Sequence, residues 1–443
     1  MEKTKKVFTN IYIYFLVTLF FILWLVSFMA NNDLLKVNFD IESAGFIVIG
    51  IIVFIVLTFI KDTFYMMPIL VYTPFVFARG FNETNIPLGF YLVIGFAVLG
   101  IIIHVIRFRA RLKFGSYFIG FAVFLLGIIL GGIEKEVIIS NLLLLIVGGL
   151  LILIAYSFIV TYLNKHDFSD LATIMTGLGL ILVFESFAQQ YLLYPDSMFI
   201  NKTIIVGWGL SNNIALMLLM CIPFTVYLSV KNKNILSLIY VALFITFLGF
   251  IVLNYSRGAI IVVICTLPII MLYAFISSKH KISYTFNVIF ILTLLIVGGV
   301  IAYNKDTELF DSIIVEITKV DFDSLNGRGQ IYEKMLGELK DNFWFGKGIF
   351  NSPNEDGTDY LWGHNVYIHT IYTLGFFGFL TLIIHLFQKY YLLLKKPSTG
   401  KVFTALALFS SGLYGLVDVS YFYLNFMMVM IAVLALVQYE IEE

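Results

Sequence analysis

Charged residues are scarce in this sequence. Only 13% of its 443 residues are Asp, Glu, Lys or Arg, whereas 60% are hydrophobic and 17% are aromatic. Such a composition is typical of a chain whose solvent is lipid. The formal net charge is zero, so the basic surface of a nucleic-acid-binding protein is lacking. These shortages indicate a polytopic membrane protein with no nucleic-acid partner.

Cysteines and signature motifs are also sparse. Cys221 and Cys265 both fall in apolar runs, where a thiol is expected to act as a small packing residue. Walker loops, zinc-ligand spacings and serine nucleophile elbows are lacking. Asp321-Phe322-Asp323 matches the aspartate pair with which nucleotide-sugar glycosyltransferases hold a metal. Those enzymes need an α/β domain, for which residues 304–362 are too few, so we expect no metal and no cofactor.

Long apolar runs dominate what is present. A membrane-spanning helix needs about 20 mostly apolar residues, and by that rule fourteen segments are candidate spans: 11–29, 44–60, 66–78, 88–106, 117–130, 138–163, 171–188, 204–230, 235–253, 259–276, 282–303, 366–387, 402–417 and 421–439. The third and fifth are short and could be re-entrant, which leaves twelve or thirteen spans open. We expect an all-α polytopic protein with about fourteen spans in a single transmembrane domain, residues 1–443.

Basic residues give the orientation, because cytoplasmic linkers retain Lys and Arg. With the N-terminus inside, the inner linkers hold Lys3, Lys5, Lys6, Lys61, Arg107, Arg109, Arg111, Lys113, Lys165, Lys231, Lys233, Lys279, Lys281, Lys389, Lys395, Lys396 and Lys401. The short outer linkers hold only Lys36, Arg79, Lys135, Lys202 and Arg257. This bias predicts cytoplasmic termini and places the long loop, residues 304–362, outside.

The long loop has helical periodicity of its own. Ile331, Tyr332, Met335, Leu336 and Leu339 share one side of a helical wheel, opposite the charged residues, so this stretch predicts an amphipathic helix that stops near residues 341–342. Arg328 projects onto the apolar side of that wheel and is expected to point toward the membrane domain. A second amphipathic segment is predicted at residues 309–317.

Few histidines lie where the outer side is predicted. Of the six histidines, only His364 and His369 reach that side, and His364 stands where a span meets water. An imidazole there, with an ordinary pKa of about 6.5, can exchange protons near neutral pH. The alternative is that His364 is a histidine at the membrane interface with no catalytic role.

Two arginines add cationic groups to the same side. Arg257 stands between two apolar runs with almost no linker, and an arginine at a membrane edge usually has a partner. Glu185, Asp418 or an anionic ligand could fill that place, and the alternative is an arginine that only sets topology. Arg328 at a helix N-terminus adds the positive end of a helix dipole. Together the two arginines are suited to a diphosphate.

The ordered set of Ser256-Arg257-Gly258, then Arg328, then residues 342–348 with their Gly346-Lys347-Gly348 turn, then His364-Asn365 with Gly375 and Gly378 beyond, resembles the bacterial O-antigen ligase and polymerase family. The resemblance covers roughly residues 254–378. Thr373 departs from it, because many members have an acidic residue two positions before the glycine that matches Gly375. The expected fourteen spans fit polymerases better than ligases.

The resemblance implies a metal-independent, inverting glycosyltransferase at the outer face of the bacterial cytoplasmic membrane. Its donor would be a glycan on undecaprenyl diphosphate, used to build O-antigen or capsular polysaccharide, with a flippase and a chain-length regulator as partner proteins. Arg257 and Arg328 would bind the diphosphate, His364 would deprotonate the attacking sugar hydroxyl, and Asn365 would orient it.

Three functions remain open from sequence. A polymerase and a ligase share the site and differ in the acceptor, which is a lipid-linked repeat unit for the polymerase and a lipid core or another acceptor for the ligase. A flippase would handle the same lipid-linked glycans, but it would place charges deep in its helices around a central cavity. Here the helix cores have few charges, which favours an outward-facing enzyme.

Overall fold

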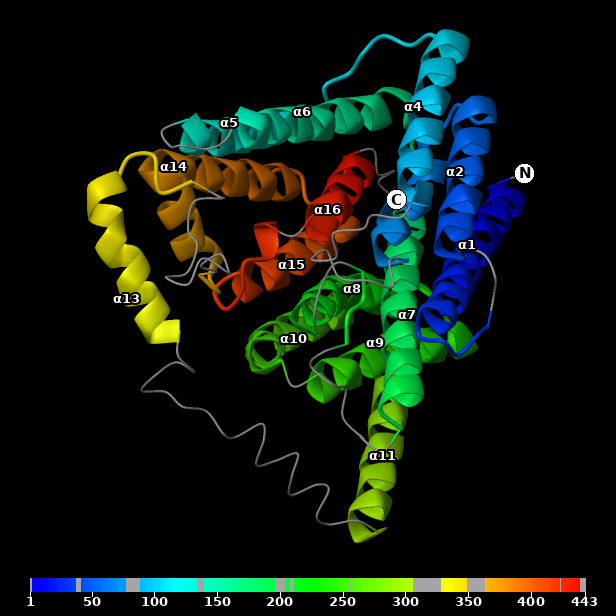
Figure 1. The fold of residues 1–443 in the computed structure, drawn as a ribbon. Helices are drawn as coiled ribbons and strands as arrows, with labels where there is room; N and C mark the ends of the chain where they lie inside the picture. Colours follow the sequence, from blue (N-terminus) through cyan, green and yellow to red (C-terminus); the bar gives the residue numbers. More distant parts are fainter. Residues whose placement is uncertain are drawn as a thin grey trace. The chain divides into compact units, whose positions relative to one another are not determined.

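The fold is helical throughout the described part of the chain (Figure 1). The computed structural model describes residues 2–36, 41–76, 88–133, 139–195, 204–207, 211–254, 256–305, 328–348, 363–422 and 424–438. The chain divides into two compact units: unit 1 contains residues 1–112, 159–291 and 424–443, and unit 2 contains residues 113–158 and 292–423. The expected all-α class is confirmed.

Each of the fourteen predicted segments contains a helix. Unit 1 holds α1 (Glu2–Asn31), α2 (Ile41–Phe59), η1 (Thr63–Met66), α3 (Met67–Tyr72), η2 (Thr73–Phe75), α4 (Leu88–Phe108), α7 (Phe168–Leu193), α8 (Ser211–Lys231), α9 (Asn234–Leu253), α10 (Arg257–Ser277) and α16 (Leu424–Val437). Unit 2 holds α5 (Phe118–Ile133), α13 (Arg328–Leu339), η4 (Lys340–Asn342), α14 (Val366–Leu394), α15 (Thr399–Tyr414) and η5 (Ser420–Phe422). Two further helices, α6 (Ile139–Tyr162) and α11 (Lys281–Lys305), belong partly to each unit.

Membrane-spanning character is clear for most of these helices. Among the described residues, nine helices are long and apolar enough to cross a bilayer, and three shorter apolar helices lie at residues 118–131, 152–162 and 425–437. The chain is therefore an all-α polytopic membrane protein. The count of fourteen spans and the inside and outside faces stay predictions.

Helices α2 and α4 run parallel to each other in unit 1. Gly89 near the start of α4 packs on Ser43 near the start of α2, and Gly100 further along α4 packs on Leu57 near the end of α2. Two parallel neighbours require the chain between them to return from one end of the pair to the other. The third predicted segment is the only part of residues 60–87 that is apolar enough to make that crossing.

The third segment, η1–α3–η2, follows α7 in the required direction. Asp62, just before η1, hydrogen-bonds His166 at the start of α7. Further on, the Tyr72 hydroxyl donates to the Ile174 carbonyl over 2.9 Å, and Gly207, at the predicted outer end of the span 204–230, packs on the carbonyl of Pro74. These thirteen residues rise about 20 Å at the pitch of their helical types. The third segment therefore traverses unit 1, although its α-helical part is only six residues long.

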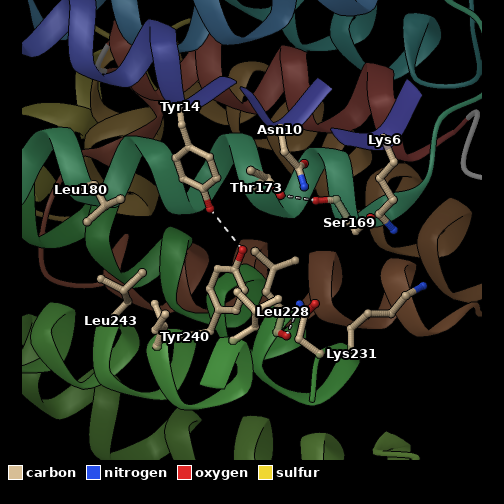
Figure 2. Close-up of a pocket in the computed structure, with 13 residues that line it drawn as sticks. Lys6, Asn10, Tyr14, Ser169, Thr173, Leu180, Leu228, Lys231, Tyr240 and Leu243 are labelled. Carbon is tan, nitrogen blue, oxygen red and sulfur yellow. Dashed lines mark hydrogen bonds between the residues drawn. The ribbon is translucent and has the colours of Figure 1, made fainter. Parts of the chain in front are cut away.

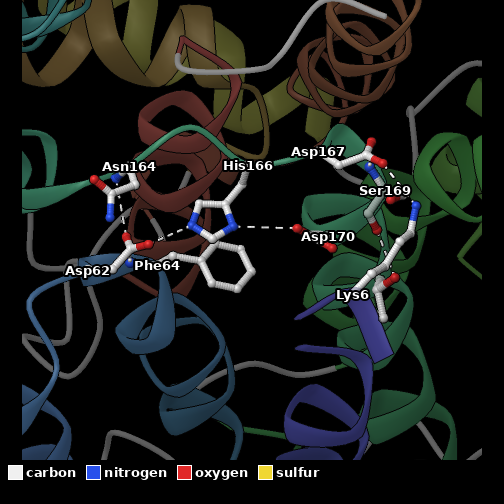
Figure 3. A network of polar contacts seen from close by, with 9 residues as sticks. Lys6, Asp62, Phe64, Asn164, His166, Asp167, Ser169 and Asp170 are labelled. Atoms are coloured by element: carbon white, nitrogen blue, oxygen red, sulfur yellow. Dashed lines mark hydrogen bonds and ion pairs between the residues drawn. The ribbon is translucent and has the colours of Figure 1, made fainter. Parts of the chain in front are cut away.

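Linkers predicted to share the inner side do lie together at one end of unit 1 (Figure 3). His166 lies between two carboxylates, with Nε2 at 2.8 Å from Asp62 and Nδ1 at 3.4 Å from Asp170. Burial lowers the pKa of His166, but its hydrogen bonds to the carboxylates of Asp170 and Asp62 outweigh burial and raise the pKa. Lys6 of α1 pairs with Asp167 over 2.9 Å at the same end. The start of α1 and the linkers before η1 and α7 are thereby tied together.

Helix α14 is the central element of unit 2. It runs antiparallel to α5, because Gly120 packs on His385 and Gly131 packs on Leu374. Residue Gly375 interrupts it with φ 67° and ψ −169°, values outside the helical range. The N-terminal part of α14 is thus a separate short helix that leads into the candidate site.

The C-terminal end of α14 corrects one expectation. The predicted segment stopped at residue 387 and left Lys389 in an inner linker, whereas α14 continues to Leu394 and Lys389 is 1% exposed. Its ammonium donates a hydrogen bond to the Tyr421 hydroxyl and lies over the Tyr390 ring. A lysine with such partners can be part of a helix, which is why a rule based on charge ended the segment too early.

Candidate active site

The turn after α15 collects residues from three elements of unit 2. Its three successive carbonyls each accept a hydrogen bond: Gly415 from the backbone N–H of Val366 over 2.7 Å, Leu416 from the Asn365 side chain over 2.9 Å, and Val417 from the Arg328 guanidinium over 2.9 Å. The N-terminal ends of α13 and α14 are therefore both hydrogen-bonded to the backbone of residues 415–417.

Asn365 begins α14 as its N-cap. The side-chain Oδ1 accepts from the backbone N–H groups of Tyr367 and Ile368, at 2.9 and 3.1 Å, while Nδ2 donates to Leu416. An N-cap satisfies backbone donors that the first helical turn leaves unpaired. Both ends of the amide are thus engaged with protein, which gives Asn365 a positioning role. Its direct contact with substrate stays a prediction.

His364 precedes that cap in a strained conformation. Its φ is 43°, in the left-handed region that non-glycine residues rarely occupy. The Tyr332 hydroxyl of α13 donates to the His364 carbonyl over 3.2 Å and holds it there. Strain of this kind gathers at functional sites. The imidazole is therefore presented at the mouth of α14 by backbone geometry.

The electrostatics of His364 favour a neutral imidazole. Burial lowers its pKa most, the nearby Arg328 cation lowers it further, and the Asp418 carboxylate opposes both. Its Nδ1 atom is buried without a hydrogen-bond partner among the described residues. The net result is a pKa below the usual 6.5 of histidine, so the ring is unprotonated at neutral pH and ready to accept a proton.

Arg328 lies at the N-terminus of an amphipathic helix, where the sequence pattern predicts it. Helix α13 begins at Arg328 and ends at Leu339, followed by the 3-10 turn to Asn342, close to the expected stop. Met335 and Leu339 are buried on the predicted apolar side, whereas Leu336 is 49% exposed. The Arg328 guanidinium reaches the 415–417 turn from the first residue of this helix. Only one N–H of the five in a guanidinium is needed for the carbonyl of Val417.

Asp418 is the residue that the sequence pattern missed as a member of this group. It is 2% exposed, follows the 415–417 turn directly, and interacts electrostatically with His364 and Tyr332. The predicted topology could have found it, since the linker between the last two spans is expected on the same outer side as His364. The sequence pattern indicates Asp418 only as a possible partner for Arg257.

The Gly346-Lys347-Gly348 turn packs into the break of α14. The backbone N–H groups of Lys347 and Gly348 donate to the carbonyls of Tyr372 and Thr373, both over 2.8 Å. In return, the N–H of Phe376 donates to Phe343 over 2.8 Å. Residues 343–348 therefore satisfy the backbone groups that the interruption at Gly375 releases. The turn secures the short N-terminal helix of α14.

A polar link joins the C-terminal end of α13 to α14. The Tyr372 hydroxyl donates to the Glu338 carboxylate over 2.9 Å, and the Lys347 ammonium lies 3.5 Å from the same carboxylate. Three elements, α13, the glycine turn and α14, are thus connected around Glu338. This arrangement fixes the helix that bears Arg328 relative to the helix that follows His364.

His369, the second histidine predicted on the outer side, has a different environment. His369 is 4% exposed inside α14, and its Nδ1 accepts a hydrogen bond from the backbone N–H of Gly363 over 3.3 Å. An imidazole nitrogen that accepts an N–H is unprotonated. His369 thus supports the segment that presents His364.

Arg257 belongs to unit 1, where it is the first residue of α10 after a short linker from α9. The proposed pairing with Glu185 is not formed, since both carboxylate oxygens of Glu185 are buried without a hydrogen-bond partner in the described part of the chain. Convergence of Arg257 with Arg328 and His364 stays a prediction. The segments 309–317 and 321–323 lie outside the described residues.

One family model matches the part of the chain that contains most of this site. Residues 241–383 match the family model described as O-antigen ligase. The matched range contains Arg257, Arg328, His364 and Asn365, and it ends before Asp418. No curated protein matches the chain. Over residues 241–383, this polytopic membrane protein is thus similar to the O-antigen ligase family.

Proposed function

We propose that this chain is a polysaccharide polymerase that transfers a glycan from undecaprenyl diphosphate to a lipid-linked repeat unit. The reaction takes place at the outer face of the cytoplasmic membrane, without a metal and with inversion. The observation that carries the proposal is the convergence of Arg328, His364 and Asp418 around the 415–417 turn. A flippase and a chain-length regulator stay predicted partners.

His364 acts as the general base in this reaction. The hydroxyl oxygen of the acceptor sugar forms a bond to the anomeric carbon of the donor, and its proton moves to the imidazole. The bond between that carbon and the diphosphate oxygen breaks, and undecaprenyl diphosphate leaves. A base with a pKa below 6.5 is fully available at neutral pH, while the nearby Asp418 carboxylate stabilises the imidazolium that forms.

Arg328 stabilises the negative charge that grows on the departing diphosphate. A fixed guanidinium stabilises the transition state more than the ground state, because the charge on the bridging oxygen increases as the bond breaks. Val417 holds the guanidinium in place through one donor, and the remaining N–H groups are suited to phosphate oxygens. Arg257 is proposed to bind the same diphosphate.

A ligase is the second candidate, because the matched family model is described as O-antigen ligase. The test is to supply the purified full-length chain with a lipid-linked repeat unit, with and without a lipid-core acceptor. A ladder of lengthening oligomers supports the polymerase, whereas a single transfer to the lipid core alone contradicts it. His364→Ala should abolish either product. Unchanged product from that variant would remove the site from the proposal.

A further inference from the structure

Lys389 of α14 differs from other lysines of this fold in what surrounds its ammonium. Lys6 and Lys231, which line a cavity in unit 1 (Figure 2), both pair with the Asp167 carboxylate, at 2.9 and 3.8 Å. Lys389 of unit 2 is 1% exposed, and within the described part of the chain no acidic side chain pairs with it. Its ammonium donates instead to the Tyr421 hydroxyl. A buried ammonium without a carboxylate is costly, so this lysine is a candidate for a functional role.

Aromatic rings from two helices and from η5 enclose this contact. The Lys389 ammonium lies 4.9 Å from the ring centroid of Tyr390 and 5.0 Å from that of Tyr421. The Tyr421 ring also packs near Phe124 of α5 and His385 of α14, with centroids 6.2 and 6.0 Å apart. Tyr421 is therefore held at its ring by two helices and at its hydroxyl by the lysine, which fixes η5 on α14 at this point.

Tyr421 ends a short segment, residues 415–421, that begins in the candidate site. The first three carbonyls of this 415–421 segment bind the N-terminal ends of α13 and α14, and the hydroxyl of its last residue accepts from α14. A Cβ on Gly415 would lie 3.4 Å from the Ser420 hydroxyl oxygen, so the two ends of the segment lie close together. Asp418 stands between the two anchors, and both of them set its position.

The first turn of α14 borders the same cluster. Tyr367, the second residue of α14, interacts electrostatically with both Tyr390 and Tyr421. The rings around Lys389 thus lie beside the short helix that follows His364. The lysine and the imidazole therefore adjoin the same two pieces of unit 2, which are this short helix and the 415–421 segment.

We propose that Lys389 is a positioning residue of the candidate site. Through Tyr421 it holds the 415–421 segment, so that the Asp418 carboxylate stays beside His364. A methionine of similar length would fill the same space but could not donate to the Tyr421 hydroxyl. The inference deepens the proposed polymerase function, on which only its effect on the rate of chain extension rests.

Two other roles of Lys389 predict different results at His364. A lysine that only supports the fold would leave the pKa of His364 unchanged in any variant that folds. A lysine that acts on the imidazole directly through its charge would lower that pKa, so its removal would raise it. Displacement of Asp418 removes the carboxylate that raises the pKa of His364, so the pKa should fall. The sign of the change therefore separates the three roles.

The charged and titratable groups around His364 and Lys389 form two separate sets. His364 faces groups from three elements: Arg328 and Tyr332 of α13, Asp418 of the 415–421 segment and His369 of α14. Lys389 faces groups from two elements: His385 and Tyr390 of α14 and Tyr421 of η5. Helix α5 presents phenylalanine rings to this second set. Among the described residues no group belongs to both sets, so the 415–421 segment is the connection between them.

The test measures the pKa of His364 in the purified full-length chain, from the pH dependence of its modification by diethyl pyrocarbonate, followed by mass spectrometry of the His364 peptide. Lys389→Met should lower this pKa by about 0.5 or more, part of the roughly 1 to 3 that a neighbouring carboxylate contributes. Tyr421→Phe removes the hydroxyl but no charge and should lower the pKa as well, which keeps the test decisive if the lysine variant fails to fold. A rise in Lys389→Met, or an unchanged pKa in Tyr421→Phe, overturns the proposal.

Lys395→Met and Tyr391→Phe are the matched controls. Lys395 also lies over a tyrosine ring of α14, 5.4 Å from the centroid of Tyr391, but both side chains are exposed. Both controls should leave the pKa of His364 in place, and an equal decrease in them would contradict a specific role of Lys389. In an Asp418→Asn background, Lys389→Met should produce no additional decrease, because its effect passes through Asp418. An additional decrease would show another route and overturn the proposal.

Chain extension separates this inference from the proposed function. If the pKa of His364 falls in Lys389→Met but the acid side of the rate profile does not move with it, His364 is not the general base, while the positioning role of Lys389 stands. If His364→Ala abolishes extension but Lys389→Met leaves the pKa of His364 unchanged, the proposed function stands and the positioning role is wrong.

Discussion

At the scale of single residues, His364 is governed by two opposing neighbours. Burial and the Arg328 cation lower its pKa, and the Asp418 carboxylate raises it. A proposed general base works only in its neutral form. The rate of chain extension is therefore expected to fall on the acid side, as the pH drops through a pKa below 6.5.

Asp418→Asn should move that acid limb to lower pH. The substitution removes the carboxylate that raises the pKa of His364, while an amide oxygen can still accept from the backbone N–H of Val419 as the carboxylate does over 2.8 Å. The measurement is the initial extension rate as a function of pH. Glu333→Gln, an equal charge change on an exposed residue of α13, should leave the midpoint in place. A shift to higher pH in Asp418→Asn would contradict the assigned neighbours.

Arg328→Lys should lower kcat by about a hundredfold, the usual loss when one transition-state donor is removed. An ammonium is a point charge, so it cannot bond Val417 and also hold two phosphate oxygens in a fixed plane. The control is Lys340→Gln, which removes an exposed cation just after α13. The measurement is the steady-state kcat of both variants with a lipid-linked donor. An unchanged kcat in Arg328→Lys would show that the guanidinium only supports structure.

At the scale of elements, the glycine turn and the break in α14 depend on each other. Gly346 and Gly375 have φ of 72° and 67°, and a Cβ on either would meet backbone atoms of the other's segment. A left-handed conformation costs a non-glycine residue about 1–2 kcal/mol, and a backbone clash adds to it. Gly375→Ala should therefore lower the free energy of unfolding by about 2 kcal/mol or more, measured by unfolding in detergent.

Gly337→Ala provides the matched control for that prediction. Gly337 lies inside α13, and a Cβ there would meet no atom within 4 Å. Alanine is favoured over glycine in a helix interior by about 1 kcal/mol, so this variant should be as stable as the unaltered chain or slightly more stable. Equal destabilisation of both variants would mean that the break in α14 tolerates a side chain.

Sequence periodicity predicted α13 well but not the pairing of residues 343–348 with α14. Apolar spacing fixes which face of a helix is buried, and Met335 and Leu339 are buried accordingly. The bonds from Lys347 and Gly348 to Tyr372 and Thr373 join backbone groups, which carry no side-chain signature. Asn365 illustrates the same limit, because a residue expected to orient substrate is engaged through both ends of its amide as a helix cap.

At the scale of the whole molecule, the directions of neighbouring helices agree with the basic-residue pattern. Helices α2 and α4 are parallel, and α5 and α14 are antiparallel, as an alternating path of fourteen spans requires. Hydropathy could predict these runs, because lipid forces every backbone group into an internal hydrogen bond and so favours helices. Hydropathy could not predict the broken third segment. Its two prolines, Pro68 and Pro74, interrupt the regular backbone hydrogen bonds of a helix.

Cysteine labelling tests that path. In a background with Cys221 and Cys265 replaced by alanine, Asp33→Cys and Lys340→Cys should react with an impermeant maleimide in intact cells. Lys165→Cys and Lys396→Cys should react only after the membrane is opened. All four positions are exposed in the structure, so access depends on the side of the membrane. Wild-type levels of glycan product from each variant serve as the control for folding.

The pair Asp33→Cys and Lys165→Cys isolates the third segment. Five predicted spans separate the two positions, so they are expected on opposite sides of the membrane. If the segment that contains α3 turned back instead of crossing, four spans would remain and both positions would label from the same side. That outcome would conflict with the parallel arrangement of α2 and α4, and it would place either His364 or the N-terminus on the wrong side for the proposed reaction.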